Sequence, residues 1–188
     1  ELIKQNKISL IIKKIEGYLS LLKHQKVDPE NLIFTKMLSK DYDKYNKIIT
    51  DTLFGAKVTT FSKTSTEAVE QISTSIVPSL FREGISLITY FGHSSSTTLE
   101  FNLESPESYQ NQGKYPLFIA LGCSVGDFFT FSASRLTTGL TISEKYTLAP
   151  ERGTIGFVAS THYGIVHYLD IWNTEAYKAI SRTNYGST

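Results

Sequence analysis

The chain has 188 residues, 40% of them hydrophobic and 20% charged. That length suits one domain with a sizeable buried core, and the composition is typical of a globular chain and excludes a disordered one. Nineteen basic side chains nearly cancel eighteen acidic ones, so we expect no nucleic-acid partner. The single cysteine, Cys123, excludes an internal disulfide framework, and no apolar run approaches the ~20 residues of a membrane span.

Five segments predict short strands, and helical periodicity predicts helices around them. The strands are expected at residues 32–37, 56–61, 86–91, 117–121 and 154–159. The helices are expected at residues 2–22, 41–54, 64–83, 141–148 and 168–182. We expect the second helix to turn Leu53 inward, and we expect Pro78 to disturb the third helix before Gly84 ends it.

Strands and helices alternate along the chain, and the strands are nearly continuous apolar runs. This pattern predicts an α/β fold in which helices cover both faces of a mostly parallel sheet. Ligands of such sheets bind outside the carboxyl ends of the strands. Two consecutive strands end there in reactive residues, because Gly92-His93 follows one and Gly122-Cys123 follows the next.

Cysteine and histidine at neighbouring strand ends are the pair that a cysteine peptidase needs. The thiolate is the nucleophile, and the imidazole accepts the proton and returns it to a leaving amine. Thirty residues separate the two, which suits one crossover that places the strand ends side by side. Gly92 and Gly122 allow close approach of a substrate backbone, and a helix expected after Cys123 would direct its positive end at the sulfur.

The residues alone leave a second interpretation open. A lone cysteine at the end of a buried strand commonly packs as a small apolar side chain. A lone histidine after a strand commonly lies at the surface or bonds its neighbours. On this interpretation the chain is an unrelated α/β domain with a buried cysteine.

The two strand ends resemble segments of the gingipain family of bacterial cysteine peptidases. Residues 87–94 (LITYFGHS) are similar to the family's apolar strand followed by Gly-His. Residues 116–128 (PLFIALGCSVGDF) are similar to its nucleophile segment. Weaker similarity covers residues 11–18, which resemble the helix before the catalytic subdomain, and residues 142–161, which resemble the next helix and strand.

The resemblance implies a caspase-like three-layer α/β sandwich with Cys123 as nucleophile and His93 as general base and acid. It implies an oxyanion hole made by the backbone N–H groups of Cys123 and of Gly92 or His93. Residues 1–27 would be an amphipathic linking helix from a missing N-terminal part, and residues 28–188 the catalytic subdomain.

The resemblance also implies a peptide-binding surface around the two strand ends. Its expected members are Ser94, Ser124, Thr161, His162 and Tyr163, whereas Tyr168 is expected to pack within its helix.

The sequence departs from the family at two points. Ser94 stands where the family usually has glycine after the histidine, and no acidic residue can be assigned to orient His93 or to line a specificity pocket. Glu100, Asp127 and Asp170 are the candidates, although a solvated surface charge is the usual role of such residues. No calcium-loop pattern is present, and we expect no metal or cofactor.

Two functions therefore compete. The first is a cysteine endopeptidase of the cell surface or the secreted fraction, with the transpeptidase of type IX secretion as a close variant. The second is a peptidase-like domain without activity that serves as a binding or structural module. Both imply a protein or peptide partner and an extracytoplasmic location in a bacterium, with the targeting signal outside this chain; the oligomeric state stays open.

Overall fold

The computed structural model describes residues 31–36, 42–62, 70–71, 76–130 and 139–184. Five parallel strands form its central sheet in the order β2-β1-β4-β6-β7. The strands are β1 (Asn31–Lys36), β2 (Lys57–Ser62), β4 (Leu87–Phe91), β6 (Leu117–Leu121) and β7 (Gly156–Ala159). The predicted helix at residues 2–22, and with it the predicted linking segment 1–27, lies outside the described residues.

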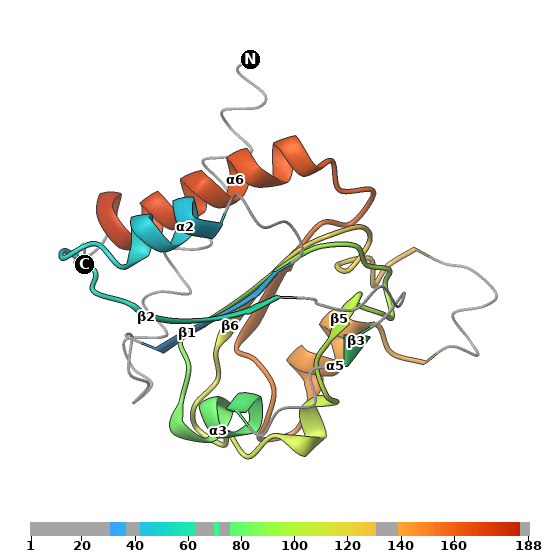
Figure 1. Ribbon diagram of the computed structural model, residues 1–188. Coiled ribbons are helices and arrows are strands. Elements are labelled where there is room, and N and C mark those ends of the chain that lie inside the picture. Colours follow the sequence, from blue (N-terminus) through green and yellow to red (C-terminus); the bar gives the residue numbers. More distant parts are fainter. Residues whose placement is uncertain (1–30, 37–41, 63–69, 72–75, 131–138, 185–188) are drawn as a thin grey trace.

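Helices cover both faces of this sheet, so the predicted three-layer α/β sandwich is confirmed (Figure 1). One face carries α2 (Tyr42–Ile49) and α6 (Val166–Lys178), which continues into the π-helical turn η2 (Ala179–Thr183). The other face carries α3 (Ile76–Glu83) and α5 (Ile142–Leu148). The connections between neighbouring parallel strands therefore pass over one face or the other.

Strands β4 and β6 are buried along their whole length because each contributes to two cores. Leu87 and Phe91 pack with Tyr177 of α6 on one face, whereas Ile88 and Tyr90 pack with Phe81 of α3 on the other. Successive side chains of a strand point to opposite faces, so a strand covered on both faces must be apolar throughout. This explains why both strands are predictable from their apolar runs.

Helix α2 is shorter than the sequence predicts, and the expected inward position of Leu53 is wrong. The helix ends at Ile49, and Asp51 then organises a turn in which its carbonyl accepts the Gly55 N–H at 2.7 Å. Gly55 adopts a φ of +68°, which favours glycine. Because the helical repeat stops before it, Leu53 is 56% exposed.

The helix predicted from residue 64 onward is also corrected. Glu70–Gln71 form the short strand β3, which pairs in parallel with β5 (Phe101–Asn102) in a separate two-stranded sheet. Helix α3 begins only at Ile76, which puts Pro78 in its first turn. A proline there costs no hydrogen bond, so it does not disturb the helix.

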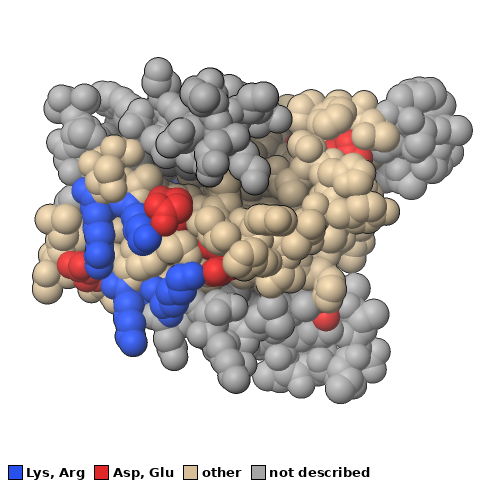
Figure 2. Space-filling view, turned by 90° about the horizontal axis from the view of Figure 1, so that it is seen from above, with Lys and Arg blue, Asp and Glu red and all other residues tan. Residues whose placement is uncertain are grey.

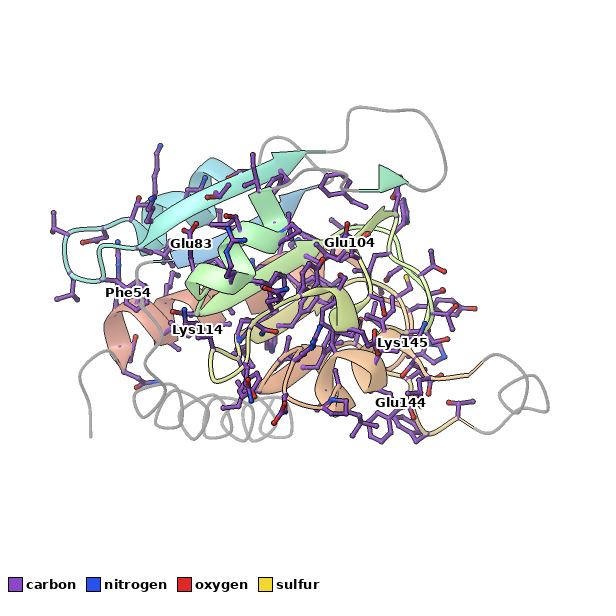
Figure 3. The ribbon with its side chains drawn as sticks, turned by 90° about the horizontal axis from the view of Figure 1, so that it is seen from below. Phe54, Glu83, Glu104, Lys114, Glu144 and Lys145 are labelled. Atoms are coloured by element: carbon purple, nitrogen blue, oxygen red, sulfur yellow. The ribbon has the colours of Figure 1, made fainter. Side chains whose placement is uncertain are left out.

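The amino ends of β4 and β6 are tied to α3 by Lys114. Its ammonium group donates to the carbonyl oxygens of Arg82 at 2.9 Å and Glu83 at 3.3 Å (Figure 3). These carbonyls end the helix, where a cation is favoured by the helix dipole. The two strands that carry the candidate site are therefore held at both ends, since the turns at their carboxyl ends also contact each other.

Candidate active site

The turns that carry His93 and Cys123 lie side by side at the carboxyl ends of β4 and β6. The ladder between the strands pairs Phe91 with Leu121, as the predicted crossover requires. A methyl group on Gly122 would overlap the Ser94 hydroxyl and lie 2.8 Å from the Gly92 carbonyl oxygen. The two turns can approach this closely only because residue 122 has no side chain.

Tyr90 holds the backbone of the His93 turn through a hydrogen bond. The Tyr90 hydroxyl donates to the His93 carbonyl oxygen, which also accepts the Glu100 N–H at 3.0 Å. Burial raises the pKa of Tyr90 well above its usual value, so the phenol keeps the proton that it donates. These bonds fix the backbone of His93, whose side chain is exposed to solvent.

Ser94 joins the two turns directly. Its hydroxyl donates to the carbonyl oxygen of Cys123 at 3.0 Å. Serine stands here in place of the glycine expected from the gingipain pattern, and a glycine could not make this bond. The departure from the pattern therefore provides a hydrogen bond between the His93 turn and the Cys123 turn.

Cys123 is half-buried at the start of a sharp turn. Ser124 follows with a φ of +56°, in the left-handed region that non-glycine residues rarely adopt. The helix predicted after Cys123, at residues 141–148, is observed as α5, whereas residues 124–130 directly after Cys123 form turns closed by the Asp127 N–H on the Ser124 carbonyl at 3.0 Å. No helix dipole from that segment acts on the sulfur.

The loop between β7 and α6, residues 160–165, lies against the Cys123 turn. The Ser124 N–H donates to the His162 carbonyl at 2.9 Å, and the Gly126 N–H donates to the Ser160 carbonyl at 3.0 Å. The Ser160 hydroxyl donates to the Gly122 carbonyl oxygen. The Gly164 N–H points at the Cys123 sulfur, with an N···S distance of 3.4 Å.

One of the two expected oxyanion donors is occupied. The Gly92 N–H donates to the Leu121 carbonyl oxygen at 3.0 Å as a continuation of the β4–β6 ladder. An amide hydrogen committed to this bond is not available to a substrate oxyanion. The resemblance also implies the N–H groups of Cys123 and His93 as donors.

A sequence profile of peptidase family C25 matches residues 6–188. The chain belongs to this family, the gingipain family of cysteine peptidases. No curated protein matches the C25 chain at a significant level.

Solved structures agree with the family assignment at the level of the fold. The C25 chain is similar to the Arg-specific cysteine proteinase gingipain R (RgpB), with a TM-score of 0.56, 16% identity and coverage of 74% of this chain and 34% of that one. It is also similar to the complex of Porphyromonas gingivalis RgpB pro- and mature domains, with a TM-score of 0.66, 14% identity and coverage of 88% and 42%. A third structure, described as a protease, gives a TM-score of 0.59 at 16% identity, with coverage of 86% and 35%. The C25 chain thus spans between about a third and two fifths of the structures it matches.

The three acidic candidates of the C25 chain differ in their surroundings. Glu100 is half-buried and lies next to the His93 turn, because its N–H donates to the His93 carbonyl oxygen at 3.0 Å. Asp170 links α6 to α2, since it accepts bonds from Lys44 at 3.0 Å and from the Tyr45 hydroxyl. Burial raises the pKa of Asp170, but these two hydrogen bonds and the lysine charge outweigh it and lower the pKa overall. Asp127 accepts the Thr130 N–H at 3.1 Å. Asp170 therefore has a structural role in joining α6 to α2. Asp127 has a structural role in the turn at 124–130.

Charge is distributed unevenly over the face that α2 and α6 cover (Figure 2). Basic side chains gather on one side of this face. The basic residues of the two helices and η2 are Lys44, Lys47, Lys178 and Arg182. The opposite side shows mostly uncharged atoms. Large apolar side chains are exposed in the turns at 124–130, in the loop 160–165 and at the start of α6. They are Phe128, Phe129, Tyr163, Ile165, Val166, Tyr168 and Ile171.

The expected packing of Tyr168 is wrong, because its side chain is 62% exposed. Tyr163 is 78% exposed, and its ring contacts that of His162 edge to face at 4.6 Å between centroids. Thr161 and His162 are exposed as well. These loop side chains face solvent beside the Cys123 turn, where a peptide can reach them.

The resemblance placed Ser160 and Gly164 in a loop of the substrate pocket, but it did not predict that they contact the Cys123 turn from 38 and 41 residues away. The one local signal was the glycine itself, since a methyl group on Gly164 would lie 2.8 Å from the Gly122 carbonyl oxygen.

Within the described part of the chain, no group of three or more His, Cys, Asp and Glu side chains could hold a metal ion. A search of the same residues finds no helix with the length and apolar character of a membrane span.

Proposed function

We propose that this C25 domain is the catalytic part of a cysteine endopeptidase, with Cys123 as nucleophile and His93 as general base and acid. The observation that carries the proposal is the meeting of Gly92-His93 and Gly122-Cys123 at adjacent strand ends in a chain of this family. Residues 28–188 would form the catalytic subdomain, and residues 1–27 would link it to a preceding part.

The proposed reaction proceeds through a thioester. The Cys123 sulfur attacks the scissile carbonyl carbon after His93 has taken its proton, and the C–N bond then breaks as His93 returns that proton to the leaving amine. Water next adds to the thioester carbon as His93 accepts one of its protons, the C–S bond breaks, and His93 returns the proton to the Cys123 sulfur. The carboxylic acid product leaves and loses its proton to solvent. If a second amine replaces that water, the same acyl-enzyme gives transpeptidation.

The proposed oxyanion hole uses the N–H groups of Cys123 and His93, as the family resemblance implies, whereas the Gly92 amide donates to the Leu121 carbonyl oxygen. Backbone donors held in place before the reaction are worth about 10²–10³-fold in rate each. The bonds from Tyr90 and Ser94 support this role because they fix the two turns that carry the donors.

The peptide would lie along the turn residues Ser94 and Ser124 and the loop residues Thr161, His162 and Tyr163. Exposure of the loop residues supports contact with a substrate. The apolar side chains exposed around the same turn favour peptides with apolar side chains near the scissile bond. As in the family generally, we expect an enzyme of the bacterial surface or the secreted fraction.

The test compares Cys123→Ala and His93→Ala with His167→Ala in the full-length protein, using a fluorogenic peptide library. His167 is exposed on α6 and serves as a matched histidine control. We expect Cys123→Ala to abolish cleavage, His93→Ala to reduce it by about 10²–10⁴-fold, and His167→Ala to stay within about twofold of the unmutated protein.

The competing function, an inactive binding module, makes a different prediction for the thiol. A nucleophile reacts with iodoacetamide in the folded protein, and a peptidyl inhibitor protects it. If Cys123 reacts only after denaturation, the peptidase proposal fails and the binding module is favoured.

A further inference from the structure

The Gly164 backbone lies directly against the sulfur of Cys123. Its N–H donates to the sulfur at 3.4 Å, and its carbonyl oxygen lies 3.9 Å from the same atom. The peptide groups of one residue therefore offer a donor to a thiolate and an acceptor to a thiol. The donor contact is the shorter, and a hydrogen bond to a charged acceptor is about twice as strong as a neutral one.

Gly164 can reach this position only because it is glycine. A methyl group on it would lie 2.8 Å from the Gly122 carbonyl oxygen and 2.7 Å from a methyl carbon of Leu169. The Leu169 side chain can move, whereas the buried Gly122 directly follows β6 and its carbonyl oxygen also accepts the Ser160 hydroxyl. An added methyl group therefore pushes the loop away from the sulfur.

The rest of the loop is anchored independently of the sulfur. Backbone bonds from Ser124 to His162 and from Gly126 to Ser160 hold the loop against the nucleophile turn. Because these bonds already hold the loop in place, little further conformational entropy is lost when the Gly164 N–H contacts the Cys123 sulfur.

We propose that Gly164 is a positioning residue whose backbone N–H holds the Cys123 sulfur in place. The inference rests on the proposed function, because it assigns a device to the nucleophile of that site. Its tests read the thiol directly and so do not depend on peptide cleavage.

The first test is the rate of Cys123 alkylation by iodoacetamide in Gly164→Ala. We expect the rate at pH 7 to fall about tenfold, as loss of one hydrogen bond to the sulfur implies. Leu148→Ala is the control, since that side chain is 63% exposed on α5, and its rate should equal that of the unmutated protein. An unchanged rate in a folded Gly164→Ala overturns the proposal.

A second measurement needs no variant and covers the case in which Gly164→Ala does not fold. In the unmutated protein, the amide proton of Gly164 should shift in the NMR spectrum when iodoacetamide alkylates Cys123. A Gly164 amide that does not respond to alkylation of Cys123 overturns the proposal. If both thiol tests succeed while no peptide is cleaved, the proposed peptidase function fails and the role of Gly164 stands.

Discussion

Substitution of Gly122 by alanine tests the close packing that brings the two turns together. The added methyl group would overlap the Ser94 hydroxyl, lie 3.0 Å from the Ser94 β-carbon and lie 2.8 Å from the Gly92 carbonyl oxygen. The first two contacts are with a short side chain on a turn, and the third is with backbone at the end of a buried strand. Neither side can yield without moving one turn away from the other.

The expected cost follows from two contributions. Overpacking by one methyl group in a closely packed region costs about 1–3 kcal/mol. Displacing Ser94 also breaks its bond to the Cys123 carbonyl, which contributes about 1 kcal/mol. We therefore expect Gly122→Ala to lower the free energy of unfolding by about 2–4 kcal/mol.

The assay is urea unfolding of Gly122→Ala, Ser94→Gly and the double variant. Ser94→Gly alone removes the hydrogen bond and should cost about 1 kcal/mol. In the double variant the Ser94 side chain is absent, so the methyl group added at residue 122 is close only to the Gly92 carbonyl oxygen. The decrease in its free energy of unfolding should therefore be about 1–2 kcal/mol smaller than the sum of the decreases in the two single variants. Losses that add fully, or a Gly122→Ala protein as stable as the unmutated one, would refute the proposed packing.

Two further predictions concern the helices around the sheet. Because the pKa of Asp170 is lowered in the folded state, its pairing with Lys44 stabilises the fold above the unfolded pKa of about 3.9 and is lost as the pH falls through the lowered value. Asp170→Asn should therefore be less stable than the unmutated protein at pH 7, by under about 1 kcal/mol for so exposed a pair, and the difference measured by urea unfolding should vanish in acid. Thr141 caps α5 in a reciprocal box with Glu144, so Thr141→Ala should lower the free energy of unfolding by about 1 kcal/mol, whereas no change would mean that the cap contributes nothing.

The sheet and the meeting of the two strand ends could be predicted because both depend on strongly patterned segments. Residues 117–121 are apolar at every position, and the structure begins and ends β6 at those residues. Once β4 and β6 are neighbouring parallel strands, the residues after them must lie at one edge of the sheet. No knowledge of the loops is needed for that step.

The loops and short elements could not be predicted in the same way. Leu53 continues the helical spacing of α2, but the Asp51 turn ends the helix first, and turn chemistry overrides periodicity there. The contact between Gly164 and the Cys123 sulfur joins residues 41 positions apart. Such a contact depends on how β7 and α6 pack, for which the local sequence gives no signal.

The left-handed backbone of Ser124 has a consequence for the stability of this domain. Its left-handed conformation, with a φ of +56°, costs about 1–2 kcal/mol for a residue with a side chain, and glycine would avoid that cost. Glycine also gives the unfolded chain more conformational freedom, which opposes this gain by about 0.4–1 kcal/mol. The net change in stability on Ser124→Gly is therefore smaller than the strain in the folded backbone alone would suggest.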